Sequence, residues 1–172
     1  MKKVLAVIGV LVLIVLVTPM FLSSHFSMSR TIEINAPLTT VFTNLTDLNV
    51  YAKWNPFPEG DPTNTNEITG NGVGAYMTWK GEKTGEGKMT IAEVEQDKKI
   101  TVKMDFYKPM NGEGVVQWLT SSKSETSTEL VWTFEQNLPY FNRYFGLFMD
   151  SMMGKHFEKV LSNYKAMMES AQ

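Results

Sequence analysis

The 172-residue sequence contains no cysteine. This absence excludes thiol catalysis, zinc sites with thiolate ligands and a disulfide framework. Histidine is also scarce, with two residues, and no group of His, Asp and Glu has the spacing of metal ligands. We therefore expect no metal site and no cofactor.

The sequence also lacks a basic cluster. Lys and Arg number 16 against 18 Asp and Glu, which gives a net charge of −2. Nucleic-acid binding needs a concentrated positive surface, so this class of function is excluded. The glycine-rich segments GNGVG and GEKTGEG lack the Lys-Ser ending of a phosphate-binding loop, and no serine lies in a nucleophile elbow.

An uncharged apolar run from Val4 to Leu22 follows Lys2 and Lys3. A helix of that length reaches across the ~30 Å hydrocarbon core of a bilayer. The run has two interpretations, an uncleaved signal anchor and a cleaved signal peptide. The nearest small-x-small triplet, residues 27–29, lies late for cleavage, which favours a transmembrane signal anchor over residues 1–22.

The charges that flank the apolar run predict its orientation. Both lysines precede it, whereas Arg30 is the first basic residue after it. The positive-inside rule then places the N-terminus in the cytoplasm and the rest of the chain in periplasmic or extracellular space. We expect residues 23–28 to be a short linker and residues 29–172 to form one domain, a usual size for a single core.

The longest periodic segment of the remaining chain runs from Pro139 to about Met168. Its spacing predicts one amphipathic helix, and Pro139 suits the start of a helix because proline lacks only a donor that the first turn leaves unpaired. The predicted apolar face contains Phe145, Met149, Met152, Met153, His156, Phe157, Val160, Tyr164 and Met167.

The segment before this helix reads as strands and turns. A strand from Arg30 to Asn35 precedes two short helices, one over residues 38–45 and one that Asp47 caps and that runs through Lys53. A proline-rich loop then runs from Trp54 to about Asn66 and is either a lid or a surface excursion. Further alternating segments, most regular at Ile100 to Phe106, predict about seven antiparallel strands with one apolar face. We expect an α+β domain in which a curved sheet packs on the long helix.

Three segments carry a resemblance to a known family: EINAPLTTVFTNLTDLNVYAKWNPF, GNGVGAYMTWKGEKTGEGKMTI and YFGLFMDSMMGKHFEKVLSNYKAMME. Together with the order of elements, they resemble the polyketide cyclase/dehydrase-like branch of the START-like (SRPBCC, helix-grip) superfamily, from about Ser29 to Glu169. The resemblance implies a helix-grip fold: a seven-stranded antiparallel sheet around a long C-terminal helix, two small helices at one end, and an enclosed apolar cavity. An N-terminal span is compatible with anchored bacterial members, so we expect a single-pass protein of the bacterial inner membrane.

The resemblance also implies which side chains line the cavity. Methionine and tryptophan there have two interpretations, ligand-contacting wall and ordinary core filler. Trp54, beside the proline-rich loop, is a candidate gate residue. The candidate ligand-binding residues are Trp54, Met77, Trp79, Met89, Met104, Phe106, Trp118, Trp132, Phe134, Phe145, Met149, Met152, Met153 and His156.

His156 is the one candidate catalytic residue. It has three interpretations: a core histidine, a ligand contact and a general base. A cyclase or dehydratase needs an acid or base within reach of its substrate, but Asp105, Glu135 and Asp150 fall on the solvent side of their elements by the alternation pattern.

Three hypotheses of function follow. The first is a membrane-anchored monomer that binds an apolar or amphipathic small molecule, such as a lipid, between the sheet and the C-terminal helix. The second is an enzyme of the polyketide cyclase or dehydratase type that uses His156. The third is a structural or regulatory envelope module with a filled core and no ligand.

Overall fold

The computed structural model describes residues 1–170. A helix at the N-terminus precedes a domain in which a strand, two short helices, six strands and a long helix follow one another. The elements are α1 (Lys2–Val17), η1 (Thr18–Phe21), β1 (His25–Ile34), α2 (Leu38–Leu45), α3 (Leu48–Trp54), β2 (Thr65–Thr69), β3 (Tyr76–Gly81), β4 (Gly85–Glu95), β5 (Lys99–Lys108), β6 (Gly112–Ser124), β7 (Ser127–Asn137), η2 (Tyr140–Asn142) and α4 (Arg143–Ser170).

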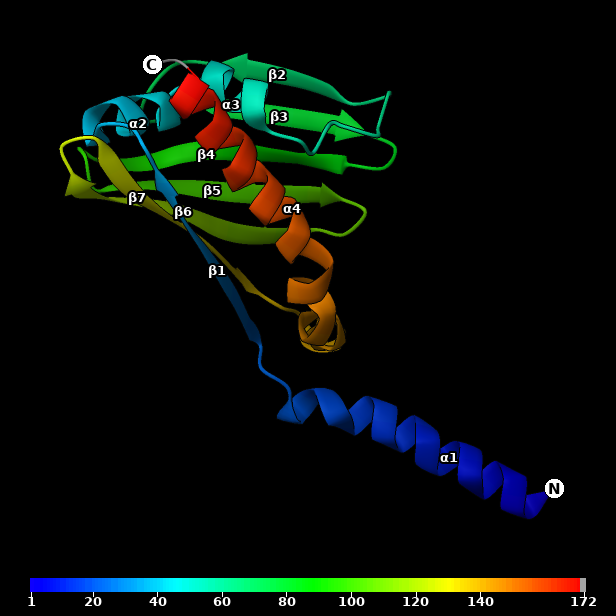
Figure 1. The fold of residues 1–172 in the computed structure, drawn as a ribbon. Helices are drawn as coiled ribbons and strands as arrows, with labels where there is room; N and C mark the ends of the chain where they lie inside the picture. The colour runs from blue at the N-terminus through cyan, green and yellow to red at the C-terminus, as the bar shows by residue number, and fades with distance from the viewer. Residues whose placement is uncertain (171–172) are drawn as a thin grey trace.

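The seven strands form one antiparallel sheet in the order β1-β7-β6-β5-β4-β3-β2. Neighbours in the chain are neighbours in the sheet, except that β1 pairs with β7. The sheet curves around α4, and α2 and α3 lie at one end of it (Figure 1). This arrangement confirms the predicted α+β helix-grip fold.

The core lies between the concave face of the sheet and the C-terminal part of α4. The buried helix residues are Phe157, Val160, Leu161, Tyr164 and Met168. They recur at the three- and four-residue spacing that places side chains on one face of a helix. Burial of each large apolar side chain stabilises the fold by about 1.5–3 kcal/mol, so this face holds α4 in the sheet.

A side-chain cap on α3 and a buried face on α2 position the short helices that close the end of the sheet. The Asp47 carboxylate accepts a hydrogen bond from the Asn49 amide at 2.8 Å, which confirms the predicted N-cap of α3. α2 buries Val41, Phe42 and Leu45. These contacts fix the position of α3, whose last turn lies in the interior of the domain.

Strand β1 is longer than the sequence pattern predicted. It begins at His25, and its first residues pair with β7, Phe26 opposite Gln136 and Met28 opposite Phe134. Residues 25–28, predicted to be a linker, therefore belong to the sheet. The period-two alternation was present in the sequence, but the polar residues Ser27 and Ser29, which alternate with Phe26 and Met28, made it resemble a loop.

The predicted apolar face of α4 was wrong in its N-terminal part. Phe145 and Met152 are 53% and 66% exposed, and His156 is exposed as well. The cause is visible in Figure 1, where the start of α4 extends past the edge of the sheet and has no strand beneath it. Apolar periodicity identifies a helical face but not the length over which the face is covered.

Helix α1 projects away from the domain (Figure 1). The segment Lys2–Phe21 has a mean hydropathy of 3.0 and is almost wholly exposed, so by length and composition it is able to cross a membrane; a signal sequence has the same properties. Its last turns contact the start of α4. Tyr140 and Tyr144 donate hydroxyl hydrogen bonds to the carbonyls of Leu16 and Val15, at 2.6 and 2.7 Å.

Candidate ligand cavity

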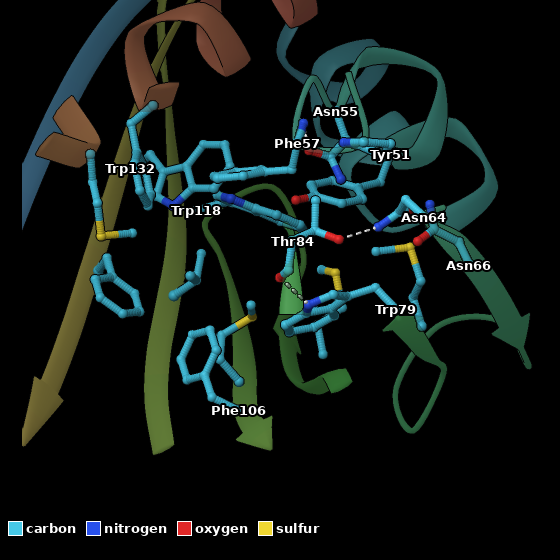
Figure 2. Close-up of a pocket in the computed structure, with 18 residues that line it drawn as sticks. Tyr51, Asn55, Phe57, Asn64, Asn66, Trp79, Thr84, Phe106, Trp118 and Trp132 are labelled. Carbon is cyan, nitrogen blue, oxygen red and sulfur yellow. Dashed lines mark hydrogen bonds between the residues drawn. The ribbon is translucent and has the colours of Figure 1, made fainter. Parts of the chain in front are cut away.

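A cavity of about 170 Å³ lies between the concave face of the sheet, the end of α3 and the middle of α4. Figure 2 shows the side chains that surround it, with Trp118 and Trp132 on one side and Trp79, Asn64 and Asn66 on the other. Its walls consist of Tyr51, Asn55, Phe57, Pro58, Asn64, Asn66, Met77, Trp79, Thr84, Met89, Met104, Phe106, Val116, Trp118, Trp132, Phe134, Met153 and Phe157.

The floor of the cavity is an aromatic cluster. Trp118 of β6 and Trp132 of β7 are directly opposite each other in the sheet, so both side chains point to the concave face. Their rings meet edge to face, with centroids 5.7 Å apart. Trp54, at the end of α3, packs edge to face on Trp132 at 6.2 Å. Side chains from three elements therefore form one aromatic cluster, in which Trp118 and Trp132 face the cavity and Trp54 packs behind them.

The indole nitrogens of Trp54, Trp118 and Trp132 are buried, and none has a hydrogen-bond acceptor within the described part of the chain. The edge-to-face packing of these rings allows an N–H to face a neighbouring π-cloud, which is a weak interaction. Trp79 differs, because its indole N–H donates to the Thr84 carbonyl at 3.3 Å. The cluster therefore depends on packing far more than on hydrogen bonding.

Two glycines make room for rings in the wall. A Cβ atom at Gly87 would overlap the Trp79 ring, and one at Gly114 would lie 2.8 Å from the Phe134 ring. Contacts this short do not occur between a side chain and a rigid ring. Glycine at these two strand positions therefore lets Trp79 and Phe134 lie flat across neighbouring strands.

The polar groups of the cavity gather on one side. The Asn64 amide donates to the Thr84 hydroxyl at 2.7 Å, and the Asn55 side-chain oxygen accepts from the Phe57 amide at 3.1 Å. Asn66 is exposed at the same side. A ligand would meet amide and hydroxyl groups here and carbon or sulfur over the rest of its surface.

A loop over residues 55–64 covers this side, and Asp61 holds it in place. The buried carboxylate accepts hydrogen bonds from the Thr63 hydroxyl at 2.6 Å and from the Thr84 and Lys83 amides at 2.8 and 2.9 Å. These bonds, the one from the Thr63 side chain above all, hold the Asp61 pKa far below its usual range. The loop is therefore fastened to the β3–β4 hairpin, with Phe57 and Pro58 forming part of the cavity wall.

Tyr51 is the one ionisable side chain among the lining residues. Burial raises the pKa of its phenol, so the hydroxyl stays protonated at any physiological pH. Figure 2 shows its ring between Asn55 and Thr84, over the cavity. The wall thus offers a neutral hydroxyl donor, and it contains no carboxylate, imidazole or amine.

The structure brings most of the predicted site residues together. The side chains predicted on the concave face of the sheet lie in the wall, and one from α4 joins them. The predicted residues found there are Met77, Trp79, Met89, Met104, Phe106, Trp118, Trp132, Phe134 and Met153.

Five predicted residues lie outside the wall. Trp54 is 3% exposed and belongs to the core, so it is not a gate. Phe145 and Met152 point to solvent from the part of α4 that passes the sheet, and Met149 packs on the edge of the core. His156 is exposed and stacks on Phe57, with ring centroids 5.9 Å apart. An imidazole outside the cavity is not placed to act as a base on a ligand inside it.

The sequence patterns did not identify the lining residues of α3, of the loop over residues 55–64 and of the β3–β4 turn, nor one residue each of β2, β6 and α4. Tyr51 follows Leu48 at helical spacing, and that signal predicts a buried face. The loop residues carry no periodic signal. The missed residues are Tyr51, Asn55, Phe57, Pro58, Asn64, Asn66, Thr84, Val116 and Phe157.

A model of the family "Polyketide cyclase / dehydrase and lipid transport" matches residues 25–169. The chain belongs to this family. The match covers the whole sheet and nearly all of α4, and it begins at the first residue of β1. No curated protein matches the sequence.

Several solved structures of other proteins share the fold with this chain at low sequence identity. Norcoclaurine synthase from Thalictrum flavum, solved with dopamine and hydroxybenzaldehyde, is 13% identical with a TM-score of 0.67, covering 91% of this chain and 93% of its own. The Zhui aromatase/cyclase from a Streptomyces species is 15% identical with a TM-score of 0.59, covering 84% and 94%. A protein from Chromobacterium violaceum is 16% identical with a TM-score of 0.57, covering 83% and 96%. At these identities the likeness shows the fold alone.

Proposed function

We propose that this protein is a membrane-anchored member of the family that binds an apolar or amphipathic small molecule, such as a lipid, in the cavity between sheet and α4. The observation that carries the proposal is the composition of the wall. Aromatic and methionine side chains form most of it, and a few amide and hydroxyl groups gather on one side. Pockets for small molecules have this composition: apolar surface supplies affinity, and a few polar groups fix orientation.

The wall suits a ligand of variable shape. Four methionines, Met77, Met89, Met104 and Met153, contribute flexible thioether side chains that adapt to different apolar outlines. Each 100 Å² of apolar ligand surface removed from water contributes about 2.5 kcal/mol before the costs of association. The rigid rings of Trp118 and Trp132 in the same wall favour a ligand with a flat ring or an extended chain.

Tyr51 and the asparagines indicate where the polar end of the ligand lies. A protonated phenol donates to a carbonyl, ether or hydroxyl oxygen, and amides both donate and accept. An amphipathic ligand therefore enters with its apolar part on Trp118 and Trp132 and its polar part toward Asn64. The ring compounds bound by the norcoclaurine synthase structure are consistent with a ring-sized ligand.

A cyclase or dehydratase activity, which the family description includes, has less support. Such a reaction needs an acid or base beside the substrate. Tyr51 is the one ionisable side chain in the wall, and its raised pKa makes it a hydrogen-bond donor rather than a base. A filled core without a ligand also fits less well, because the cavity offers space beyond that of packing voids.

The proposal includes α1 as an uncleaved anchor that crosses the bacterial inner membrane once, with the N-terminus in the cytoplasm. Support comes from the hydrogen bonds between the end of α1 and the domain. Arg143 adds a third, to the Pro19 carbonyl at 2.9 Å. A segment that is removed as a signal peptide has no need of contacts with the mature domain. The cavity would then stand close to the bilayer, where apolar molecules are concentrated.

Native mass spectrometry of the full-length protein, extracted from membranes in mild detergent, tests the proposal. We expect the intact mass of a chain that begins at Met1 and, beside it, an adduct of a small apolar or amphipathic molecule. A purely apo mass, unchanged after incubation with a range of lipids and aromatic compounds, would contradict ligand binding. A mass that lacks residues 1–22 would contradict the anchor and leave the cavity hypothesis standing.

A further inference from the structure

The start of α4 carries an apolar surface that the sheet leaves uncovered. Four side chains at helical spacing, which we call the α4 stripe, are each more than half exposed: Phe141, Phe145, Phe148 and Met152, at 56%, 53%, 59% and 66%. Leu147, beside them, is 61% exposed. Contiguous exposed aromatic residues of this kind mark an interaction surface in a folded protein.

The position of the stripe indicates what covers it. Tyr140 and Tyr144, which flank it, donate hydrogen bonds to the Leu16 and Val15 carbonyls in the last turn of α1. Arg143 donates to the Pro19 carbonyl. These bonds fix the start of α4 beside the domain-proximal end of α1, and Figure 1 shows both at the same end of the molecule.

The chemistry of the segment fits the boundary between lipid headgroups and acyl chains. Residues 140–149 contain one charged side chain, Arg143, which donates a hydrogen bond to the Pro19 carbonyl of η1. Tyrosines are enriched at the membrane interface because the ring is apolar and the hydroxyl is polar. The opposite side of the helix belongs to the protein, since Asp150 pairs with Arg30 of β1 at 2.7 Å. The helix is therefore amphipathic, with an uncharged aromatic face away from the sheet.

We propose that the α4 stripe inserts into the surface of the bilayer that α1 crosses, so that the start of α4 is an interfacial helix. This inference rests on the proposed membrane anchor. Interfacial helices bury their apolar face about 5–10 Å below the headgroups. Insertion holds the domain in one orientation, and it brings Met153, which lines the cavity directly after the stripe, close to the lipid.

The absence of cysteine allows a direct test, because a single introduced cysteine is the only labelling site. Full-length protein is reconstituted into vesicles of phosphatidylcholine and phosphatidylglycerol that carry bromine on the acyl chains, and the cysteine bears a bimane fluorophore. Phe148→Cys and Met152→Cys report on the stripe. Glu125→Cys, in the exposed turn between β6 and β7, is the matched solvent control, and Val10→Cys reports on α1.

We expect brominated lipid to quench the probes at positions 148 and 152 several-fold more strongly than the probe at position 125. Bromine near the carbonyl end of the chain should quench these two most, whereas bromine at mid-chain should quench position 10 most. Strong quenching at position 10 with none at 148 and 152 would overturn the inference and leave the anchor standing. Weak quenching at position 10 would overturn both.

The alternative hypothesis is that a second copy of the chain or another part of the protein, rather than lipid, covers the α4 stripe. In that case the probes at 148 and 152 would be shielded from aqueous iodide without being quenched by brominated lipid. This outcome would also overturn the inference. Both substituted residues are exposed, so their replacement leaves the core intact.

Discussion

The two halves of α4 have similar apolar content and different environments. From Phe157 onward, the apolar side chains lie in the concave sheet, and Val160 and Tyr164 are fully buried. Before Gly154, Phe145, Phe148 and Met152 are more than half exposed, whereas Met149 and Met153 pack against the core. Arg30 joins the halves, since it pairs with Asp150 on one side and Glu158 on the other. One continuous helix thus serves the fold with its C-terminal half and, in our account, the membrane with its N-terminal half.

The sharpest test of this difference is the same substitution in each half. Phe157→Ala should lower the free energy of unfolding by about 3 kcal/mol, because it removes a buried ring from the contact between α4 and Trp132. Phe148→Ala should change it by less than about 0.5 kcal/mol, because the ring is exposed. Urea unfolding of both full-length variants in the same detergent measures the pair. Equal losses would mean that the N-terminal half is part of the folded core after all.

Two tyrosines extend the comparison to hydrogen bonds. The Tyr164 hydroxyl donates to the Val41 carbonyl at 2.6 Å inside the core, whereas Tyr144 donates to Val15 at the surface. Tyr164→Phe leaves a buried carbonyl without its donor and should cost about 1–2 kcal/mol. Tyr144→Phe should cost almost nothing in detergent, where water replaces the hydroxyl. If the two variants unfolded at the same urea concentration, the buried Tyr164 hydrogen bond would stabilise the fold no more than the exposed Tyr144 bond does.

The loop over residues 55–64 packs on the C-terminal half of α4. Phe57 contacts Phe157, and Lys159 pairs with Glu59. Asp61 holds the loop by accepting hydrogen bonds from the Lys83 and Thr84 amides. Asp61→Asn should therefore lower the melting temperature at pH 7 and loosen the cavity wall. Because the folded-state pKa of Asp61 lies below its unfolded value near 4, the ionised carboxylate stabilises the fold above pH 4.

That stabilisation is lost as the pH falls from about 4 through the folded-state pKa. The melting temperatures of the wild type and Asp61→Asn should therefore converge in acid, as measured by circular dichroism from pH 7 downward. A constant difference over this range would show that the carboxylate charge has no part in holding the loop.

The smallest effect is expected at the junction of the halves, at His156. It stacks on Phe57 outside the cavity, so His156→Ala should change the free energy of unfolding by less than about 0.5 kcal/mol and leave ligand binding unchanged. Native mass spectrometry of the variant is the check. Loss of the adduct would restore His156 as a ligand contact.

The sheet and its inward residues were predictable because strand alternation is local. Ile100, Val102 and Met104 recur at period two, so the face that they share follows from the sequence. The wall residues on β3 to β7 were identified on this basis. Tyr51 and the residues of the loop were not, because their positions depend on hydrogen bonds to residues far along the chain, such as those of Asp61 to the β3–β4 hairpin.

The sequence also did not indicate which part of the apolar face of α4 the sheet covers. Phe145 and Phe157 are both phenylalanines of the apolar face of α4. No local pattern in the sequence indicates that Phe145 is exposed and Phe157 is buried. Trp54 illustrates the converse error. Its neighbours in the sequence belong to a loop, yet three rings from other elements enclose it. The surroundings of Phe145 and Trp54 depend on the whole fold, which the local sequence pattern does not encode.

The central claim, that the cavity binds a small apolar molecule, is tested most directly by a pair of substitutions on neighbouring residues of β6. Val116 is buried and lines the cavity, whereas Val115 lies on the outer face. Val116→Phe should fill part of the cavity and abolish the adduct in native mass spectra of full-length protein. Val115→Phe, with the same added volume, should retain it. An adduct that survives in both variants would contradict our account of where the ligand binds.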